Sequence, residues 1–297
     1  MDKLKELVAE ELAAPVDPRV VELAAAIAAT HGAASRMVLF YGSCLREKQL
    51  EGLMLDFYLV VSDYRAAYGK KWLATANRLI PPNVFYFEQG GLRAKYAVLS
   101  EADFARECDV SARTPSVLAR FAQPSRLVWA YDAAARTLAI DAVSKATPAL
   151  LGLTQPTMTD EEAGDPLNIW KRAFRYTYGA ELRAERQSRP HTIVDSEPDR
   201  YIRFARAAGF PLRLGTTESQ RRMADNAWRR FQRRTRRIQV LRLAKASATF
   251  AGGVDYIAWK INRHAGTQIR IKPWQRRWPL LAAITLLPRL LKSGAVR

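Results

Sequence analysis

Runs of apolar residues predict strands in the first half of the chain. Four runs have the length of strands and are rich in β-branched and aromatic residues: 37–41 (MVLFY), 53–61 (LMLDFYLVV), 82–87 (PNVFYF) and 92–100 (LRAKYAVLS). Gln89, Gly90 and Gly91 separate the last two runs and are typical of a hairpin turn. A fifth, shorter strand is predicted within RLVWAYD.

Apolar residues at helical spacing predict helices around these strands. Residues 1–34 form helices that are split at Pro15 and Pro18, and residues 64–80 form another helical stretch. From residue 101 the pattern is helical again until the last strand. The first part of the chain is therefore predicted to be an α+β domain that ends near residue 150.

The composition of the chain changes after about residue 150. The stretch GLTQPTMTDEEAGDP at 152–166 carries turn and acidic residues, and the following residues are mostly helical and strongly basic to about residue 270. We predict three parts: an α+β domain at 1–150, a basic helical domain at 151–271 and an amphipathic tail at 272–297.

One interrupted stretch carries the candidate chemistry. In VLFYGSCLREKQLEGLMLDFYLVV, which begins at residue 38, Gly42 permits a close approach of the backbone to a phosphate and Ser43 supplies a hydroxyl. Asp56 lies in an otherwise apolar strand, where a lone carboxylate is costly unless a metal or a donor pairs it. The layout is typical of nucleotidyl transfer, in which a carboxylate holds Mg²⁺ against a triphosphate. An ordinary β-turn before a strand with a capped aspartate would give the same pattern.

The stretch resembles the nucleotidyltransferase superfamily signature, with Tyr58 in the place of its second acid. More narrowly, the chain resembles the mitochondrial-type phosphatidate cytidylyltransferases, the soluble CDP-diacylglycerol synthases, whose strand has no second acid there. The motifs that carry this resemblance lie within residues 36–185: Tyr41-Gly42-Ser43, Asp56, Phe85-Tyr86-Phe87, Lys95-Tyr96-Ala97-Val98, Arg120 before Gln123-Pro124, and Tyr178-Gly179-Ala180-Glu181-Leu182-Arg183. Ala97 and Glu181 depart from the Gly and Asp of that family.

The resemblance implies a fold, an activity and a set of site residues. The fold is a nucleotidyltransferase-like mixed-sheet domain, then a mostly helical, winged-helix-like domain and a membrane-associating C-terminus. The implied catalytic residues are Ser43, Asp56 and Lys95, with Mg²⁺ on Asp56. The implied nucleotide-binding residues are Tyr41, Gly42, Ser43, Lys95, Arg120, Glu181 and Arg183.

Several of these residues also have a purely structural interpretation. Lys95 alternates with Arg93 on one face of its strand, which suits a phosphate-binding face or a solvated edge strand. Arg120 is either a phosphate ligand or a surface arginine of a helix. Glu181 and Arg183 either reach the site from the second domain or form an ion pair on a helix surface.

Other reactive residues near the turn are expected to be structural. Asp63 is expected to cap a helix rather than to supply a second carboxylate. Cys44 is expected to pack in the core, because none of the three histidines, His31, His191 and His264, shows a triad pattern. No spacing of cysteine and histidine is typical of a zinc site, and the two cysteines, Cys44 and Cys108, favour a reducing compartment.

The amino-acid composition indicates that the protein binds an anionic partner. The chain has 297 residues, 48% of them hydrophobic, so that it can bury a substantial core. Its formal net charge is +18 and its pI is about 10.2, which indicates contact with a nucleotide, a nucleic acid or an acidic membrane.

The basic residues gather at 219–245, SQRRMADNAWRRFQRRTRRIQVLRLAK, around an apolar stripe of Trp228, Phe231, Ile238 and Leu241. Nucleic acid and an anionic bilayer are both possible partners of such a helix. The tail, KPWQRRWPLLAAITLLPRLLKSGAVR, favours the membrane, because tryptophan and arginine beside a short apolar run are typical of an interfacial anchor. A tail that docks on the protein's own core is the structural alternative. The apolar run is too short to span a bilayer.

These observations predict a peripheral membrane phosphatidate cytidylyltransferase at the cytoplasmic face of a bacterial inner membrane. It would use Mg²⁺ and join CTP to phosphatidic acid, giving CDP-diacylglycerol and pyrophosphate. The alternatives are a nucleotidyltransferase that acts on RNA or another small molecule, and an inactive, nucleic-acid-binding protein with a nucleotidyltransferase fold.

Overall fold

A computed structural model describes residues 2–47, 50–180, 189–249 and 272–274. A mixed sheet contains five strands: β1 (Ser35–Tyr41), β2 (Met54–Val61), β3 (Asn83–Gln89), β4 (Leu92–Ser100) and β5 (Ser125–Ala130). Their order is β3-β4-β2-β1-β5, and β2 pairs with β4 in parallel while the other pairs are antiparallel. The α+β class and all five predicted strands are confirmed. The predicted hairpin is confirmed too, with Gly90 and Gly91 at φ of +57° and +76° between β3 and β4.

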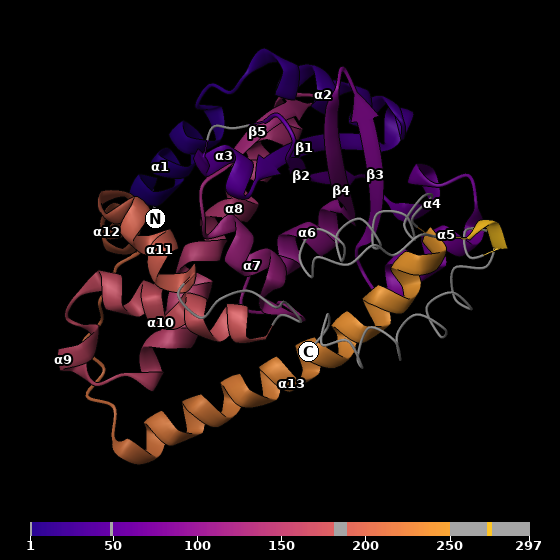
Figure 1. Cartoon of the computed structure of the whole chain (residues 1–297). Helices are drawn as coiled ribbons and strands as arrows, with labels where there is room; N and C mark the ends of the chain where they lie inside the picture. The colour runs from indigo at the N-terminus through magenta and orange to yellow at the C-terminus, as the bar shows by residue number, and fades with distance from the viewer. Residues whose placement is uncertain (1, 48–49, 181–188, 250–271, 275–297) are drawn as a thin grey trace.

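The central strands are buried on both faces of the sheet, which explains why β2 reads as a nearly continuous apolar run. Phe57 and Leu59 point to one face and Tyr58 and Val60 to the other. The first face packs against α2 (Pro18–Ala29), α4 (Tyr64–Ala67) and α5 (Lys71–Leu79), beside the short η1 (Gly32–Ala34). The second packs against α1 (Asp2–Ala13), α6 (Glu101–Glu107), α7 (Pro115–Phe121) and α8 (Ala133–Thr154). The sheet is thus the middle layer of the region (Figure 1).

The second part of the chain is helical in its described residues. α8 runs without a break across residue 150, where the first predicted boundary falls, and leads into η2 (Gln155–Thr157). The next four described helices are α9 (Asp160–Ala163), α10 (Pro166–Gly179), α11 (Arg189–Ser196) and α12 (Pro198–Ala207). Their core residues Trp170, Phe174 and Tyr201 belong to the same apolar cluster as the second face of the sheet. One core therefore joins the helices to the sheet.

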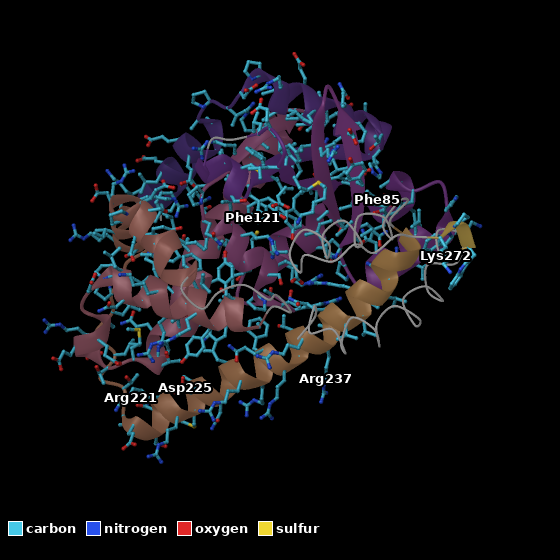
Figure 2. All side chains as sticks on the ribbon, in the orientation of Figure 1. Phe85, Phe121, Arg221, Asp225, Arg237 and Lys272 are labelled. Atoms are coloured by element: carbon cyan, nitrogen blue, oxygen red, sulfur yellow. The ribbon has the colours of Figure 1, made fainter. Side chains whose placement is uncertain are left out.

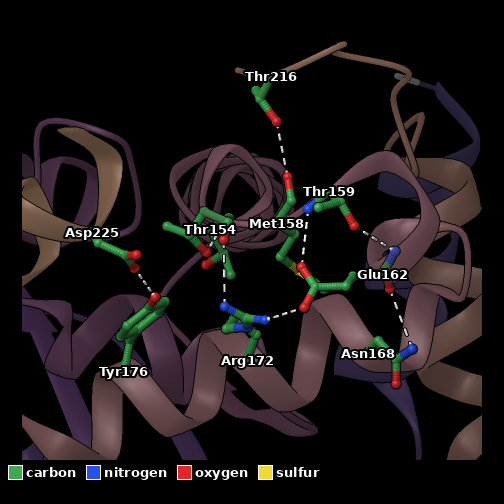
Figure 3. A network of polar contacts seen from close by, with 10 residues as sticks. Thr154, Met158, Thr159, Glu162, Asn168, Arg172, Tyr176, Thr216 and Asp225 are labelled. Carbon is green, nitrogen blue, oxygen red and sulfur yellow. Dashed lines mark hydrogen bonds and ion pairs between the residues drawn. The ribbon is translucent and has the colours of Figure 1, made fainter. Parts of the chain in front are cut away.

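A polar network fixes the junction before α10 (Figure 3). Thr159 and Glu162 form a capping box at the start of α9. Glu162 also pairs with Arg172 of α10 at 3.1 Å. Tyr176 of α10 donates a hydrogen bond to Asp225 of α13 (Glu218–Thr249). These contacts join α9 to α10 and α10 to α13.

The last described helix, α13 (Glu218–Thr249), lies along the helical part and reaches the edge of the sheet at β3 (Figure 1). Trp228 stacks on Tyr176 with ring centroids 5.0 Å apart, and its indole Nε1 donates to Leu153 O at 2.8 Å. Near the other end, Arg242 Nε donates to Pro81 O at 2.7 Å, and Lys245 Nζ donates to Pro82 O at 2.8 Å. Contacts at both ends therefore fasten the helix across the molecule.

The apolar stripe predicted on this helix is confirmed in its first half only. Trp228 is buried and Phe231 packs against the core, whereas Leu241 is 52% exposed. The inward positions near Leu241 belong to Arg242 and Lys245, because the carbonyl groups before β3 accept hydrogen bonds from them. Among the described residues, no helix is long and apolar enough to cross a membrane. The predicted tail, apart from residues 272–274, lies outside the described residues.

Candidate active site

The candidate site lies on a single transverse row of the sheet. Pairing in register places five residues side by side across all five strands: Ser125, Tyr41, Asp56, Lys95 and Tyr86. Directly paired side chains project from the same face of a sheet, and in this row it is the face that packs on α7 and α8. Register therefore brings together three residues predicted separately from the sequence: Tyr41, Asp56 and Lys95.

The Gly-Ser turn lies directly against Asp56. Gly42 follows β1 and has a φ of +98°, a value that favours glycine. A Cβ atom at this position would lie 2.9 Å from Asp56 Oδ2, so a side chain there would collide with the carboxylate. Ser43, which is half-buried, begins the short helix α3 (Ser43–Glu47). The group that Gly42 approaches closely is thus the Asp56 carboxylate, and the predicted approach to a phosphate stays a prediction.

Asp56 and Lys95 form an ion pair, with 2.9 Å between Oδ1 and Nζ. The two side chains are 20% and 27% exposed, so the pair is partly screened by solvent. Oδ1 is itself inaccessible to solvent and accepts no hydrogen bond from a described residue, because the ammonium lies outside hydrogen-bonding geometry. Asp56 therefore has a buried oxygen that a cation could coordinate.

These features fit a magnesium ion that arrives with phosphate groups. Mg²⁺ is commonly bound by one or two carboxylates together with substrate phosphates and water, rather than by a complete protein cage. Within the described part of the chain, no group of three or more acidic, histidine or cysteine side chains could hold a metal ion. Asp56 is the one predicted metal ligand, and a nucleotide would have to supply further oxygen ligands.

Tyr58 stands at the position where the nucleotidyltransferase signature has its second acid, and its ring makes aromatic contacts. Its side chain is 4% exposed, and its ring lies 5.3 Å from that of Tyr41 and 5.4 Å from that of Phe121 of α7. A carboxylate at this position would be buried among aromatic rings. Tyr58 therefore belongs to the core and packs against Tyr41, a member of the row (Figure 2 labels the neighbouring Phe121).

Arg120 lies on the Tyr41 side of the row. Its guanidinium carbon is 5.9 Å from the centroid of the Tyr41 ring, and Nη1 donates to Ser116 O at 2.6 Å. Near it, Tyr178 of α10 donates to Gln123 Oε1 at 3.5 Å. The Arg120 motif thus lies beside Tyr41, and the Tyr178 motif contacts the same segment through Gln123, although the three are distant in sequence.

The remaining predicted residues have varied positions. Asp63 caps α4, where its Oδ1 accepts from Arg65 N at 2.7 Å, so the expected cap is confirmed and the second carboxylate is not found there. Cys44 is buried, as expected of a packing residue. Arg93 lies on the same strand face as Lys95 but pairs with Glu88 at 3.8 Å. Glu181 and Arg183 lie outside the described residues.

Sequence analysis missed two members of the row. Tyr86 is the cross-strand neighbour of Lys95, and its hydroxyl donates to Glu88. Partial burial and the neighbouring carboxylate raise the pKa of Tyr86 to about 12. Ser125 is fully buried, and its hydroxyl has no hydrogen-bond partner among the described residues. Tyr86 belongs to the Phe85-Tyr86-Phe87 motif, but only the register of the strands shows that Tyr86 and Ser125 belong to the row.

Comparisons with known proteins give only distant similarities to solved structures. No protein-family model matches the chain, and no curated protein matches it. Among solved structures, the chain is similar to a nucleotidyltransferase-like protein from Exiguobacterium sibiricum 255-15, with 8% sequence identity and a TM-score of 0.30. The match covers 93% of this chain and 92% of the other. At this TM-score the similarity is too distant to carry an argument about the site or the activity.

Proposed function

We propose that this protein is a nucleotidyltransferase that transfers CMP from CTP to phosphatidic acid. The observation that supports it most directly is the contact of three elements at one place: the Gly42 turn, the Asp56 carboxylate and the Lys95 ammonium. A triphosphate needs a close backbone approach, a cationic side chain and a metal-binding carboxylate. The motifs that resemble the cytidylyltransferases indicate the nucleotide and the lipid acceptor.

Each residue of the site has a role in the proposed transfer. Gly42 leaves room for the Asp56 carboxylate beside the turn, and the Ser43 hydroxyl donates to a β- or γ-phosphate oxygen. Lys95 neutralises the charge that develops on the departing pyrophosphate. Asp56 would hold Mg²⁺, which when bound supplies charge neutralisation at the phosphoryl oxygens. Arg120, beside Tyr41, would contact a phosphate group at the other side of the turn.

The reaction requires no strong general base. A phosphate oxygen of phosphatidic acid attacks the α-phosphorus of CTP, and the bond from that phosphorus to the β-phosphate oxygen breaks. CDP-diacylglycerol forms and pyrophosphate leaves with its electron pair. Because the attacking phosphate is already ionised at neutral pH, no side chain has to remove a proton from it.

The outer face of α13 suits an anionic membrane surface. Five of its exposed arginines have no ion pair or hydrogen bond with any other described side chain: Arg229, Arg230, Arg233, Arg234 and Arg237. Arginine near an anionic bilayer is attracted by about 1 kcal/mol per side chain. Figure 2 shows nitrogen-tipped side chains along this edge of α13, with Arg237 labelled. We therefore propose peripheral association with the cytoplasmic face of a bacterial membrane, to which the tail at 272–297 would add an anchor.

A second function deserves a test because Asp56 has no acidic partner in the row. A protein that binds nucleic acid on α13 without catalysing transfer would need neither a second acid nor a lipid. A nucleotidyltransferase acting on RNA or on another small molecule would use the same turn and carboxylate.

The deciding assay combines purified protein, Mg²⁺, CTP labelled at the α-phosphate and vesicles that contain phosphatidic acid. We expect label in the lipid extract, and we expect Asp56→Asn to abolish it. Asp195→Asn is the matched control, because Asp195 also pairs with a lysine at 2.8 Å but lies in the helical part. Absence of lipid label with the wild-type protein would contradict the proposal. A parallel reaction replaces the vesicles by RNA, and label in the RNA would support the RNA-directed alternative.

A further inference from the structure

We infer that the Lys95 ammonium occupies the cation position on Asp56 in the free protein, and that it moves to the triphosphate when nucleotide and metal bind together. The inference rests on the proposed nucleotide site and adds an order to its binding steps. It assigns Lys95 two successive partners, a carboxylate and then a phosphate.

The first step of the argument is the fixed register of β2 and β4. Asp56 and Lys95 are direct partners in these parallel strands, so their backbones are held side by side. The 2.9 Å contact between Nζ and Oδ1 follows from this placement. The four-carbon stem of lysine is flexible, so its ammonium can change partner while the strand stays in place.

The second step is the shortage of negative charge at the site. Asp56 is the predicted metal ligand, and Tyr58 takes the place of a second acid. In the ion pair, the charge of the carboxylate is already balanced by the ammonium. A divalent cation approaching Oδ1 alone would also be repelled by Lys95 at short range. The free protein should therefore bind Mg²⁺ or Mn²⁺ weakly.

The third step is the change that a nucleotide brings. A triphosphate supplies oxygen ligands for the metal and several negative charges. The metal can then replace the ammonium on Asp56 while the ammonium contacts a phosphate oxygen. Arg93, the other cation on this face of β4, pairs with Glu88, so Lys95 is the cation placed to make the exchange.

The test is a calorimetric titration of the free protein with MnCl₂, repeated with a CTP analogue that has a methylene group between the α- and β-phosphorus atoms. For the wild-type protein we expect the affinity for Mn²⁺ to rise at least about tenfold when the analogue is present. In Lys95→Met, we expect the affinity for Mn²⁺ alone to rise by about tenfold or more, because the competing charge is gone. The gain from adding the analogue should shrink.

The matched control is Lys171→Met, because Lys171 is also 27% exposed and pairs with Asp195 at 2.8 Å, but in the helical part. It should leave both Mn²⁺ affinities unchanged. Adding Asp56→Asn to Lys95→Met should abolish the gain in affinity for Mn²⁺ alone. Thermal unfolding of each variant checks the fold, and Lys95→Gln serves as a second neutral variant.

Two results would overturn the inference: neutral variants of Lys95 that bind Mn²⁺ alone no more tightly than wild type, or a gain that persists without Asp56. These titrations do not depend on turnover. If metal exchange occurs but no lipid is labelled, the proposed acceptor is wrong and the exchange stands. If lipid is labelled but the exchange is absent, the proposed function stands and this inference fails.

Discussion

At the scale of single residues, Gly42 is the position where one added carbon should matter most. A Cβ there would lie 2.9 Å from Asp56 Oδ2, and its φ of +98° is a strained value for other residues. We expect Gly42→Ala to lower the free energy of unfolding by about 1–3 kcal/mol and to abolish nucleotidyl transfer. Urea unfolding and the lipid-labelling assay measure the two effects.

Gly90→Ala is the matched control for this prediction. Gly90 also has a positive φ, +57°, but a Cβ there would meet nothing within 4 Å. We expect Gly90→Ala to lower the free energy of unfolding by about 1 kcal/mol and to leave the activity intact. Equal loss of activity in the two variants would mean that backbone strain, and not the approach to Asp56, explains the Gly42 result.

His31 lies on the opposite face of the sheet, and its titration should make the stability of the protein depend on pH. Its Nδ1 lies 2.9 Å from Ala67 O, and burial lowers its pKa below the ordinary 6.5. Between the lowered folded pKa and 6.5, the unfolded chain binds more protons at this residue, so stability falls as the pH drops from about 7 to 5. We expect His31→Gln to flatten this part of the pH dependence of the unfolding free energy. An unchanged slope would show that other groups cause the loss.

At the scale of whole elements, a buried ion pair fastens α12 to α1. Arg200 is 5% exposed, and its Nη2 lies 2.8 Å from Glu11 Oε1. Its Nη1 also donates to Ala122 O at 3.1 Å, at the end of α7. The helical part is thereby tied to the helix that carries Arg120.

Removing one partner of this pair should cost more than removing both. We expect Arg200→Met to lower the free energy of unfolding by about 3–5 kcal/mol, because it leaves the Glu11 carboxylate buried without its counterion. Arg200→Met combined with Glu11→Leu should recover part of the loss. Denaturant unfolding of the two variants measures the difference, and a double variant less stable than the single one would contradict this account.

The elements differ in how far the sequence predicts them. β2 and β4 are predictable because their apolar runs are strand-like and bounded by turns. Their parallel pairing is not predictable from either run, because it depends on contacts across the whole sheet. The pattern of Gly42, Ser43 and Asp56 is local, so it can be recognised in the sequence. The contact between Asp56 and Lys95 depends on the register of β2 and β4, which the sequence does not give. The same holds for Ser125 and Tyr86, which complete the row.

The C-terminal half of α13 is also poorly predicted from the sequence. Amphipathic spacing predicts that Trp228 faces inward, since an indole prefers burial. It does not predict that Arg242 and Lys245 also face inward. These side chains donate to the carbonyl groups of Pro81 and Pro82, which precede β3 and lie far away in the sequence.

At the scale of the whole molecule, the chain carries a net charge of +18, and part of that charge is organised on one helix face. The exposed arginines at 229, 230, 233, 234 and 237 of α13 lie opposite the side that holds Trp228, Gln232 and Thr235. The structure therefore leaves this face available while the other side of the helix is fixed to the protein. A flat row of cations suits an extended anionic surface.

The proposed membrane contact predicts that position, and not only charge, decides binding to vesicles. We expect replacement of Arg229, Arg230, Arg233, Arg234 and Arg237 by glutamine to weaken flotation with phosphatidic-acid vesicles by at least about tenfold at low salt. A control variant replaces five exposed arginines elsewhere, Arg65, Arg78, Arg136, Arg203 and Arg213, and so lowers the net charge equally. It should bind nearly as well as wild type. Similar binding by both variants would mean that net charge, or the tail at 272–297, carries the attraction. Loss of RNA binding in the α13 variant, with vesicle binding unchanged, would instead assign this face to nucleic acid.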